Sequence, residues 1–196
     1  MKKRIFAYYE SLQAVDQPEE FSCSNYWKQS WERQGWECVM LNSTHAKGSN
    51  LHLKMVKKLM ELSNTLPPEL AGDFPKIMAR YVRWCALHAA GGGWMSDYDV
   101  VNINFPASVA QDHEATGTLQ VITGEPAWLF YATPGHCSAA INKFLNENLV
   151  EGTKLRTESE ILGCEDHLRF VKDLLFHARK TPNKKRSEEM RNINEL

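Results

Sequence analysis

Short apolar runs alternate with longer segments of helical periodicity along the first half of the chain. Runs of four to eight apolar residues predict strands, and apolar positions at three- and four-residue steps predict helices. We expect strands at 5–9, 36–41, 97–103, 118–123 and 128–132, and helices at 19–33, 50–62, 74–90, 134–148 and 165–179. This alternation predicts an α/β domain with a mixed, mostly parallel sheet flanked by helices.

The segment 74–90 has the clearest helical pattern. Its apolar stripe consists of Phe74, Ile77, Met78, Tyr81, Trp84, Cys85 and His88. On a helical wheel, Arg80 and Arg83 fall on the flank away from the centre of this stripe. Solvent exposure and a role in ligand binding remain open for both arginines. Three glycines, residues 91–93, end the helix.

Length and charge exclude several classes of protein. The 196 residues suit one domain, and we expect it to span 1–179, followed by a polar tail at 180–196. Lys and Arg number 23 against 24 Asp and Glu, so the net charge is −1. No global charge therefore draws the chain to nucleic acid or to an anionic membrane, and we expect neither as a partner.

Features of secreted or membrane proteins are missing from the sequence. The apolar run after the basic N-terminus stops at Glu10, which is too early for a signal peptide, and no apolar run has transmembrane length. The five cysteines show no C-x-x-C spacing. Scattered single cysteines are typical of a reducing compartment, so we expect a cytoplasmic protein.

Two aspartates carry the most specific chemistry. In an extended segment, residues i and i+2 point the same way, so Asp97 and Asp99 would present two carboxylates to one side. Mg²⁺ and Mn²⁺ are typically bound by one or two carboxylates together with waters and substrate phosphates. The alternative is that neither aspartate binds a ligand, and that both are solvated or cap a helix. The preceding glycines would allow close backbone approach, and a position between a helix end and a strand suits a ligand site.

The stretch 80–104 resembles the sugar-transferring region of D-x-D glycosyltransferases. The pattern of that region is R-x-x-x-L-x-x-x-G-G, an aromatic residue and D-x-D, and this chain matches it with Arg83, Leu87, Gly91-Gly92, Trp94 and 97–99. The group in question comprises capsular-polysaccharide and yeast mannosyltransferase-like enzymes, with the glucosylating bacterial toxins.

This resemblance implies a GT-A fold, a nucleotide-sugar donor (a UDP- or GDP-sugar), and Mn²⁺ or Mg²⁺ as cofactor. It also implies a glycan or other hydroxyl acceptor. Asp99 would bind the metal directly, and Asp97 would contact the ribose or a metal-bound water. Arg80 or Arg83 would bind the donor, because arginine provides forked donors for phosphate.

Three aromatic residues are further candidates for the donor site. Tyr8 or Tyr9, at the end of the first expected strand, would stack on the base, with plain packing as the alternative. Trp94 would form a wall of the sugar pocket, since aromatic residues often line ligand sites, and core packing is again the alternative.

Two other functions stay open. Asp97-Tyr98-Asp99-Val100 also matches the first motif of haloacid-dehalogenase-like phosphatases, in which the first aspartate is the nucleophile. That motif should follow an apolar strand near the chain start, whereas in this chain Gly-Gly-Gly-Trp-Met-Ser precedes it. The second alternative is a non-catalytic protein that binds a nucleotide or glycan. It arises because the family's acid three residues before the helix arginine is replaced in this chain by Arg80.

Overall fold

The structure is a computed structural model, and it describes residues 3–10, 18–108, 110, 119–123, 129–162 and 175–177. The helices are α1 (Pro18–Arg33), α2 (Ser43–Ala46), α3 (His52–Ser63), α4 (Pro68–Ala71), α5 (Phe74–Ala89), α7 (Pro134–Asn146) and α8 (Glu158–Leu162). The strands are β1 (Arg4–Tyr8), β2 (Glu37–Leu41), β3 (Gly93–Ser96), β4 (Val100–Asn102), β5 (Gln120–Thr123), β6 (Leu129–Ala132), β7 (Val150–Glu151), β8 (Lys154–Leu155) and β9 (Leu175–His177).

A five-stranded sheet in the order β2-β1-β3-β6-β5 forms the centre of the fold. Strand β1 pairs in parallel with both β2 and β3, whereas β6 is antiparallel to its neighbours β3 and β5. Four of the five strands therefore run in one direction and only β6 runs against them. The expected α/β class with a mixed, mostly parallel sheet is confirmed at this level.

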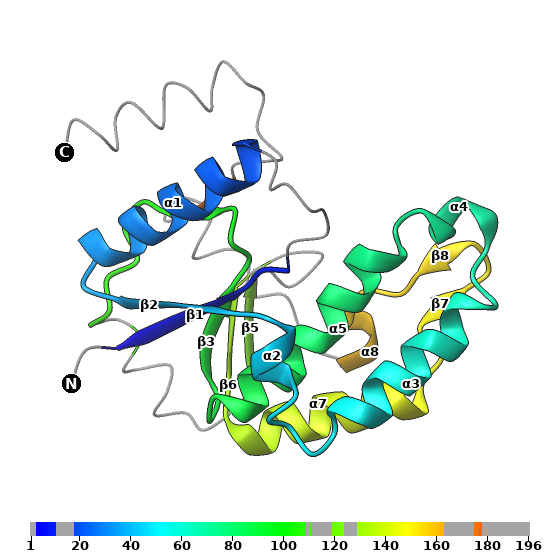
Figure 1. The fold of residues 1–196 in the computed structure, drawn as a ribbon. Helices are drawn as coiled ribbons and strands as arrows, with labels where there is room; N and C mark the ends of the chain where they lie inside the picture. The colour runs from blue at the N-terminus through cyan, green and yellow to red at the C-terminus, as the bar shows by residue number, and fades with distance from the viewer. Residues whose placement is uncertain are drawn as a thin grey trace.

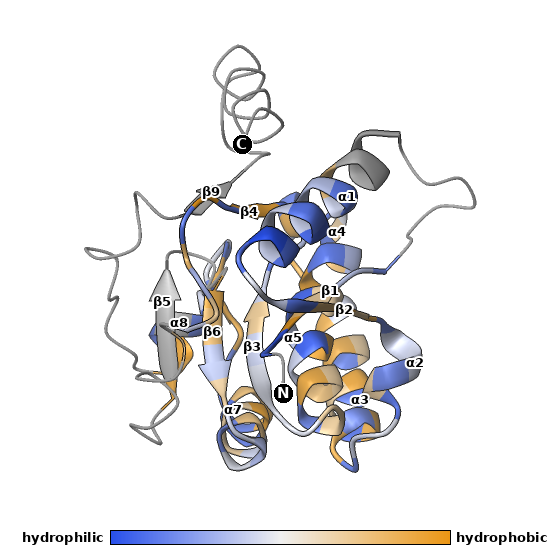
Figure 2. Cartoon of the chain, turned by 90° about the vertical axis from the view of Figure 1, so that its left-hand side faces the viewer, coloured by the Kyte–Doolittle hydropathy of each residue, from blue (hydrophilic) through white to orange (hydrophobic). Residues whose placement is uncertain are grey.

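Helices cover both faces of the sheet. Helix α1 lies on one face, and α2, α3, α5 and α7 lie on the other (Figure 1). The alternation of side chains along β1 explains both contacts, because Ile5 and Ala7 join the cluster around α1 while Phe6 and Tyr8 join the cluster around α5. In Figure 2, the hydrophobic colour follows the inner strands and the inward sides of the helices.

Helix α5 is buried on all sides along its second half. Every residue from 81 to 87 is buried, because α5 packs against α2, α3 and α7 as well as against the sheet. The expectation that Arg83 lies on a flank away from the buried stripe is therefore wrong. The helical wheel separates one apolar face from one polar face, and this description fails for a helix with neighbours on every side.

The expected strand 97–103 forms only as β4, and β3, which directly precedes it, was not expected. Strand β3 already begins at Gly93, and β4 begins at Val100. Gly91 and Gly92 have positive φ angles of 90° and 77°, so the chain leaves α5 and turns into the sheet within two residues. Between the strands, the Val100 amide donates to the Asp97 carbonyl at 3.1 Å, which closes a turn. Asp97 and Asp99 are thus not on one extended segment, contrary to the expectation.

The C-terminal part of the chain also differs from the expectation. Leu175–His177, expected within a helix at 165–179, form strand β9, which pairs antiparallel with β4. Residues 163–174 and 178–179 of that expected helix and the expected tail at 180–196 lie outside the described residues. The short elements α2, α4, α8, β7 and β8 were not expected from periodicity, because they are too short to show a repeat.

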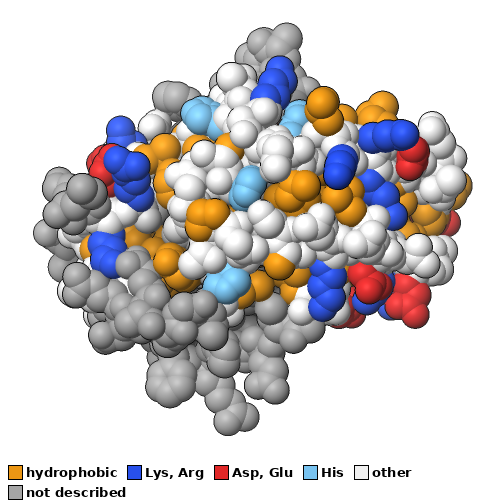
Figure 3. All heavy atoms as spheres, turned by 90° about the horizontal axis from the view of Figure 1, so that it is seen from below, with side chains coloured by type: hydrophobic (Ala, Val, Ile, Leu, Met, Phe, Trp, Pro, Cys, Tyr) orange, Lys and Arg blue, Asp and Glu red, His pale blue; other side chains and the backbone are white. Residues whose placement is uncertain are grey.

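The face that carries α3 and α7 is shown from below in Figure 3. Hydrophobic side chains are scattered there among basic and histidine side chains. Among the described residues, the large hydrophobic side chains that are exposed are Leu53 (79%) and Met60 (51%), both on α3. In the described part of the chain, no helix combines the length and apolar character needed to cross a membrane.

Candidate functional site

The D-x-D residues lie at the carboxyl end of the central strands. Strands β1 and β3 are parallel neighbours, and Ala7 lies opposite Ser96. The residues that follow each strand therefore meet at one edge of the sheet, which is where open α/β sheets bind ligands. Tyr9 contacts Tyr98, the middle residue of D-x-D, edge to face with ring centroids 5.0 Å apart. The structure thus brings together two regions that the sequence analysis had assigned to one site.

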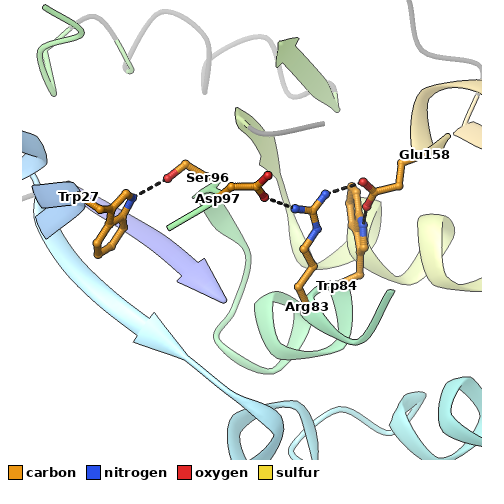
Figure 4. A network of polar contacts seen from close by, with 6 residues as sticks. All are labelled: Trp27, Arg83, Trp84, Ser96, Asp97 and Glu158. Carbon is orange, nitrogen blue, oxygen red and sulfur yellow. Dashed lines mark hydrogen bonds and ion pairs between the residues drawn. The ribbon is translucent and has the colours of Figure 1, made fainter. Parts of the chain in front are cut away.

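Arg83 links Asp97 to a second carboxylate. Its Nη1 donates to Oδ1 of Asp97 at 2.6 Å, and its Nη2 donates to Oε2 of Glu158 at 2.5 Å (Figure 4). The Arg83 side chain is 7% exposed, that of Glu158 is fully buried, and that of Asp97 is 23% exposed. One guanidinium therefore bridges a carboxylate at the sheet edge and a carboxylate in the core.

The surroundings keep Arg83 charged. Burial lowers the pKa of Arg83, but the carboxylates of Glu158 and then Asp97 more than offset this, so the pKa is raised above its ordinary value. The guanidinium also lies 5.3 Å from the centre of the Phe130 ring, which suits a cation–π contact. A buried charge needs paired, hydrogen-bonded surroundings, and Arg83 has them.

Two tryptophans bracket the D-x-D turn. The Trp27 indole donates to the hydroxyl of Ser96 at 2.7 Å, and the Trp31 indole donates to the carbonyl of Val100 at 3.0 Å. Ser96 and Val100 are the residues directly before and after 97–99. Figure 4 shows that Ser96 faces Trp27 while Asp97 faces Arg83 on the other side. The turn is therefore held at both ends by α1 and from behind by α5.

The carboxylates set limits on any metal site. Asp99 is 5% exposed and lies within the turn. Among the described residues, no three His, Cys, Asp or Glu side chains are grouped closely enough to hold a metal ion. Mg²⁺ and Mn²⁺ often take only one or two carboxylates and complete their shell with water and phosphate. The described side chains therefore do not form a site that could hold a cation by themselves.

Tyr8 is tied to the sheet edge through Glu10. Its hydroxyl donates to Oε2 of Glu10 at 3.0 Å, and Glu10 also accepts from the amide and the hydroxyl of Ser43. Burial, followed by the Glu10 carboxylate, raises the pKa of Tyr8. Tyr8 packs in the core cluster around α5, so Tyr9 is the better placed of the two tyrosines to meet a ligand.

Trp94 and Arg80 are not brought to this edge. Trp94 is 1% exposed and packs against Trp36, Phe105 and Tyr131 in the cluster on the α1 face. Arg80 is half-buried on α5 and makes no hydrogen bond or ion pair with any described residue. Of the two arginines expected to bind the donor, only Arg83 reaches Asp97.

The glycine turn lies at the opposite end of β3 from Asp97. Gly93 opens the strand and Asp97 follows its last residue, so the two ends are about 13 Å apart at ~3.3 Å per residue. The expectation that these glycines let backbone approach a ligand beside D-x-D is therefore wrong. A Cβ on Gly92 would lie 2.6 Å from the carbonyl oxygen of Ala132, so packing explains this glycine.

An open hollow of about 380 Å³ is found at this glycine end. Its lining includes Arg4, Phe6, Thr133 and the turn 91–93. Among the described residues that line it, only Arg4 is charged, and none of them provides a carboxylate for a cation. We therefore build the candidate site on Asp97, Asp99 and Arg83 at the carboxyl edge.

Sequence reasoning missed Glu158. It enters the network from α8, 75 residues after Arg83, and its second oxygen accepts from the Trp84 indole at 2.5 Å. A local signal for α8 exists, because Thr157 and Glu160 form a reciprocal capping box. That motif predicts a helix start and gives no indication that Glu158 is buried.

The buried cysteines of α5 and α7 are not suited to act as nucleophiles. Burial raises the pKa of Cys85 and of Cys137 to about 12, so both thiols stay protonated near neutral pH. A nucleophilic cysteine requires a thiolate. Cys38, Cys85 and Cys137 are free thiols, and Cys164 lies outside the described residues.

Comparison with known proteins gives no relative. No protein-family model matches the chain, and no curated protein and no solved structure matches it significantly.

Proposed function

We propose that this protein is a metal-dependent glycosyltransferase of GT-A type, which transfers a sugar from a UDP- or GDP-sugar to a glycan or other hydroxyl acceptor. The observation that carries the proposal is the position of Asp97 at the carboxyl end of the central strand, with Arg83 2.6 Å away. The resemblance of residues 80–104 to D-x-D glycosyltransferases supports it, and so does the mixed sheet with one reversed strand.

Each side chain at this edge has a chemical role in the proposal. Asp99 and Asp97 hold Mn²⁺ or Mg²⁺ together with the diphosphate of the donor. When bound there, the cation would supply positive charge beside the departing nucleoside diphosphate. Arg83 would orient Asp97 through their ion pair, and Tyr9 would offer an aromatic face to the base. The indoles of Trp27 and Trp31 hold the turn in place before a ligand arrives.

Calorimetric titration of UDP and GDP, with and without Mn²⁺, tests this proposal. We expect micromolar binding of one nucleotide that requires Mn²⁺ and is lost in Asp99→Asn. Asp73→Asn is the matched control, because Asp73 is an exposed aspartate paired with Lys76 and remote in sequence from the site. Thermal melting of each variant separates loss of binding from loss of fold. An Asp99→Asn protein that binds normally would refute the metal assignment.

A haloacid-dehalogenase-like phosphatase is the second candidate. That motif should follow an apolar strand, and the residues before D-x-D are rich in glycine. In the structure, however, residues 93–96 form the central strand β3. This removes one objection. In that reaction, a carboxylate oxygen of Asp97 would attack the phosphorus of a phosphate monoester to form an aspartyl phosphate. The bond to the ester oxygen would break, and this oxygen would leave as an alcohol with a proton from Asp99 as general acid. Pairing with Arg83 makes Asp97 a weaker nucleophile, because it withdraws charge from the carboxylate.

Two other results would favour the remaining alternatives. Trapping of an aspartyl phosphate on Asp97 would favour the phosphatase. Tight, Mn²⁺-dependent nucleotide binding without hydrolysis or transfer of the sugar would favour a non-catalytic binding protein.

A further inference from the structure

Arg83 has two carboxylate partners that differ in their access to solvent. The side chain of Glu158 is fully buried, whereas that of Asp97 is 23% exposed. The two contacts have similar lengths, 2.5 Å to Glu158 and 2.6 Å to Asp97. Only the Asp97 carboxylate can therefore meet a ligand from solution without a rearrangement of the core.

The Glu158 side of the network is fixed by further contacts. Its Oε1 accepts from the indole of Trp84, so both of its oxygens have donors inside the protein. The Trp84 ring is stacked on Phe130 with centroids 4.4 Å apart, and Phe130 also lies against the guanidinium. Glu158, Trp84 and Phe130 thus hold one end of Arg83 independently of Asp97.

A second carboxylate partner for the charged Arg83 guanidinium would be useful at a ligand site. A buried guanidinium that loses its only carboxylate is strongly destabilising, because its charge is left uncompensated. If Asp97 were the only partner of Arg83, a cation that draws on Asp97 would create that situation. With Glu158 in place, Arg83 keeps a carboxylate whether Asp97 is engaged with a ligand or not.

We propose that Glu158 is a positioning residue that serves as the permanent counter-ion of Arg83, so that Asp97 can exchange Arg83 for a bound cation and diphosphate. The role of Asp97 in ligand binding rests on the proposed function. The sharing of one guanidinium between two carboxylates rests on the network itself. The two parts call for separate measurements.

A double-mutant cycle with Asp97→Asn and Glu158→Gln measures the sharing of Arg83. Each single change leaves Arg83 one carboxylate, so we expect modest effects on the unfolding equilibrium constant. The double mutant removes both of these carboxylates. Urea unfolding gives the factor by which each variant raises the unfolding equilibrium constant. We expect the factor for the double mutant to exceed the product of the two single-mutant factors by tenfold or more. Additive effects within twofold would overturn the proposal.

Titration of Mn²⁺ with UDP or GDP measures the release of Asp97. In Glu158→Gln, Asp97 is the remaining carboxylate of this pair, and it should separate from Arg83 less readily. We expect nucleotide affinity in the presence of Mn²⁺ to fall tenfold or more, measured below the melting temperature of the variant, which should drop because its amide NH2 replaces one buried acceptor. Glu151→Gln, an exposed glutamate on β7, is the matched control and should stay within twofold of the wild type. Wild-type affinity in a folded Glu158→Gln protein would overturn the proposal.

A second variant covers the case in which Glu158→Gln does not fold. Trp84→Phe removes the indole donor to Glu158 and keeps an aromatic ring against Phe130. We expect a several-fold loss of nucleotide affinity in this variant, and unchanged affinity would count against the proposal. If the wild-type protein shows no Mn²⁺-dependent binding, the proposed function and the release of Asp97 both fail, while the double-mutant cycle still decides whether Arg83 is shared.

Discussion

Trp27 donates its indole N–H to the hydroxyl of Ser96, the residue directly before Asp97, at 2.7 Å. Both groups are buried. The same spacing of 69 residues recurs downstream, where Trp31 donates to the carbonyl of Val100 and Trp36 to that of Phe105. Three indole hydrogen bonds therefore join the segment that begins in α1 to the segment that runs from β3 past β4. The D-x-D turn lies between the first two of these hydrogen bonds.

Ser96→Ala tests the first of these contacts. The change removes one oxygen and leaves the Trp27 indole without an acceptor in the core, so we expect a loss of about 1–3 kcal/mol in the free energy of unfolding. Urea unfolding measures it. Ser63→Ala, at the exposed end of α3, should change the same quantity by less than about 0.5 kcal/mol. Equal effects of the two variants would contradict a buried hydrogen bond at Ser96.

Arg83→Ala and Arg80→Ala form a matched pair on one helix. Arg83→Ala leaves the carboxylates of Glu158 and Asp97 without their shared cation, so we expect a loss of about 3–5 kcal/mol in stability. Arg80→Ala should change it by about 0.5 kcal/mol, because Arg80 makes no polar contact with the described residues. Thermal or urea unfolding distinguishes them. A larger effect at Arg80 would mean that the two arginines have been assigned the wrong way round.

The glycine turn allows a comparison of strain with steric clash. Gly91 and Gly92 both have positive φ, but a Cβ would meet nothing within 4 Å at Gly91 and would lie 2.6 Å from a backbone carbonyl at Gly92. Gly91→Ala should therefore cost about 1–2 kcal/mol from backbone strain alone. Gly92→Ala should cost clearly more, since backbone must move. Similar unfolding midpoints for the two variants would contradict the packing of this turn against β6.

Alkaline pH should destabilise the protein through its buried thiols. The pKa of Cys85 is raised to about 12 in the folded protein, from an ordinary value of 9.0. Below pH 9 the thiol is protonated in both states, and stability is unaffected. As pH rises above 9 the unfolded chain ionises first, so stability falls, by up to about 1.4 kcal/mol per pH unit for each such thiol.

Cys85→Ala isolates this effect. The variant should be less stable than the wild type at pH 8, because it leaves a small cavity. Its free energy of unfolding should then fall less steeply between pH 9 and pH 11. Parallel pH profiles for the two proteins would show that Cys85 does not titrate differently in the folded and unfolded states.

Local patterns predicted most elements of the fold and only part of the site. Helices α1, α3 and α5 and strands β1, β2 and β6 appear close to the expected bounds, because apolar periodicity and the glycines that end α1 and α5 are local signals. Strand β3 was missed, because the strand in this region was expected to begin only at 97 and Gly93 was counted as part of the turn. Strand β9 depends on its partner β4, which no local pattern reveals.

The candidate site was likewise predictable from the sequence only in part. Asp97, Tyr9 and Arg83 were expected together, because a motif and a strand end identify them. Their environment was not predictable, since the burial of Arg83 follows from helices packed on every side of α5. Glu158 was missed because its contacts with Arg83 and Trp84 are long-range and it carries no motif of its own.

The 75 residues that separate Arg83 from Glu158 also impose an order on biosynthesis. At about 5–20 residues per second, a ribosome makes Glu158 roughly 4–15 seconds after Arg83. During that interval α5 and β3 can already form, with Asp97 as the only carboxylate of the network available to the guanidinium. The two carboxylates therefore become available to Arg83 one after the other, and α8 supplies the second of them.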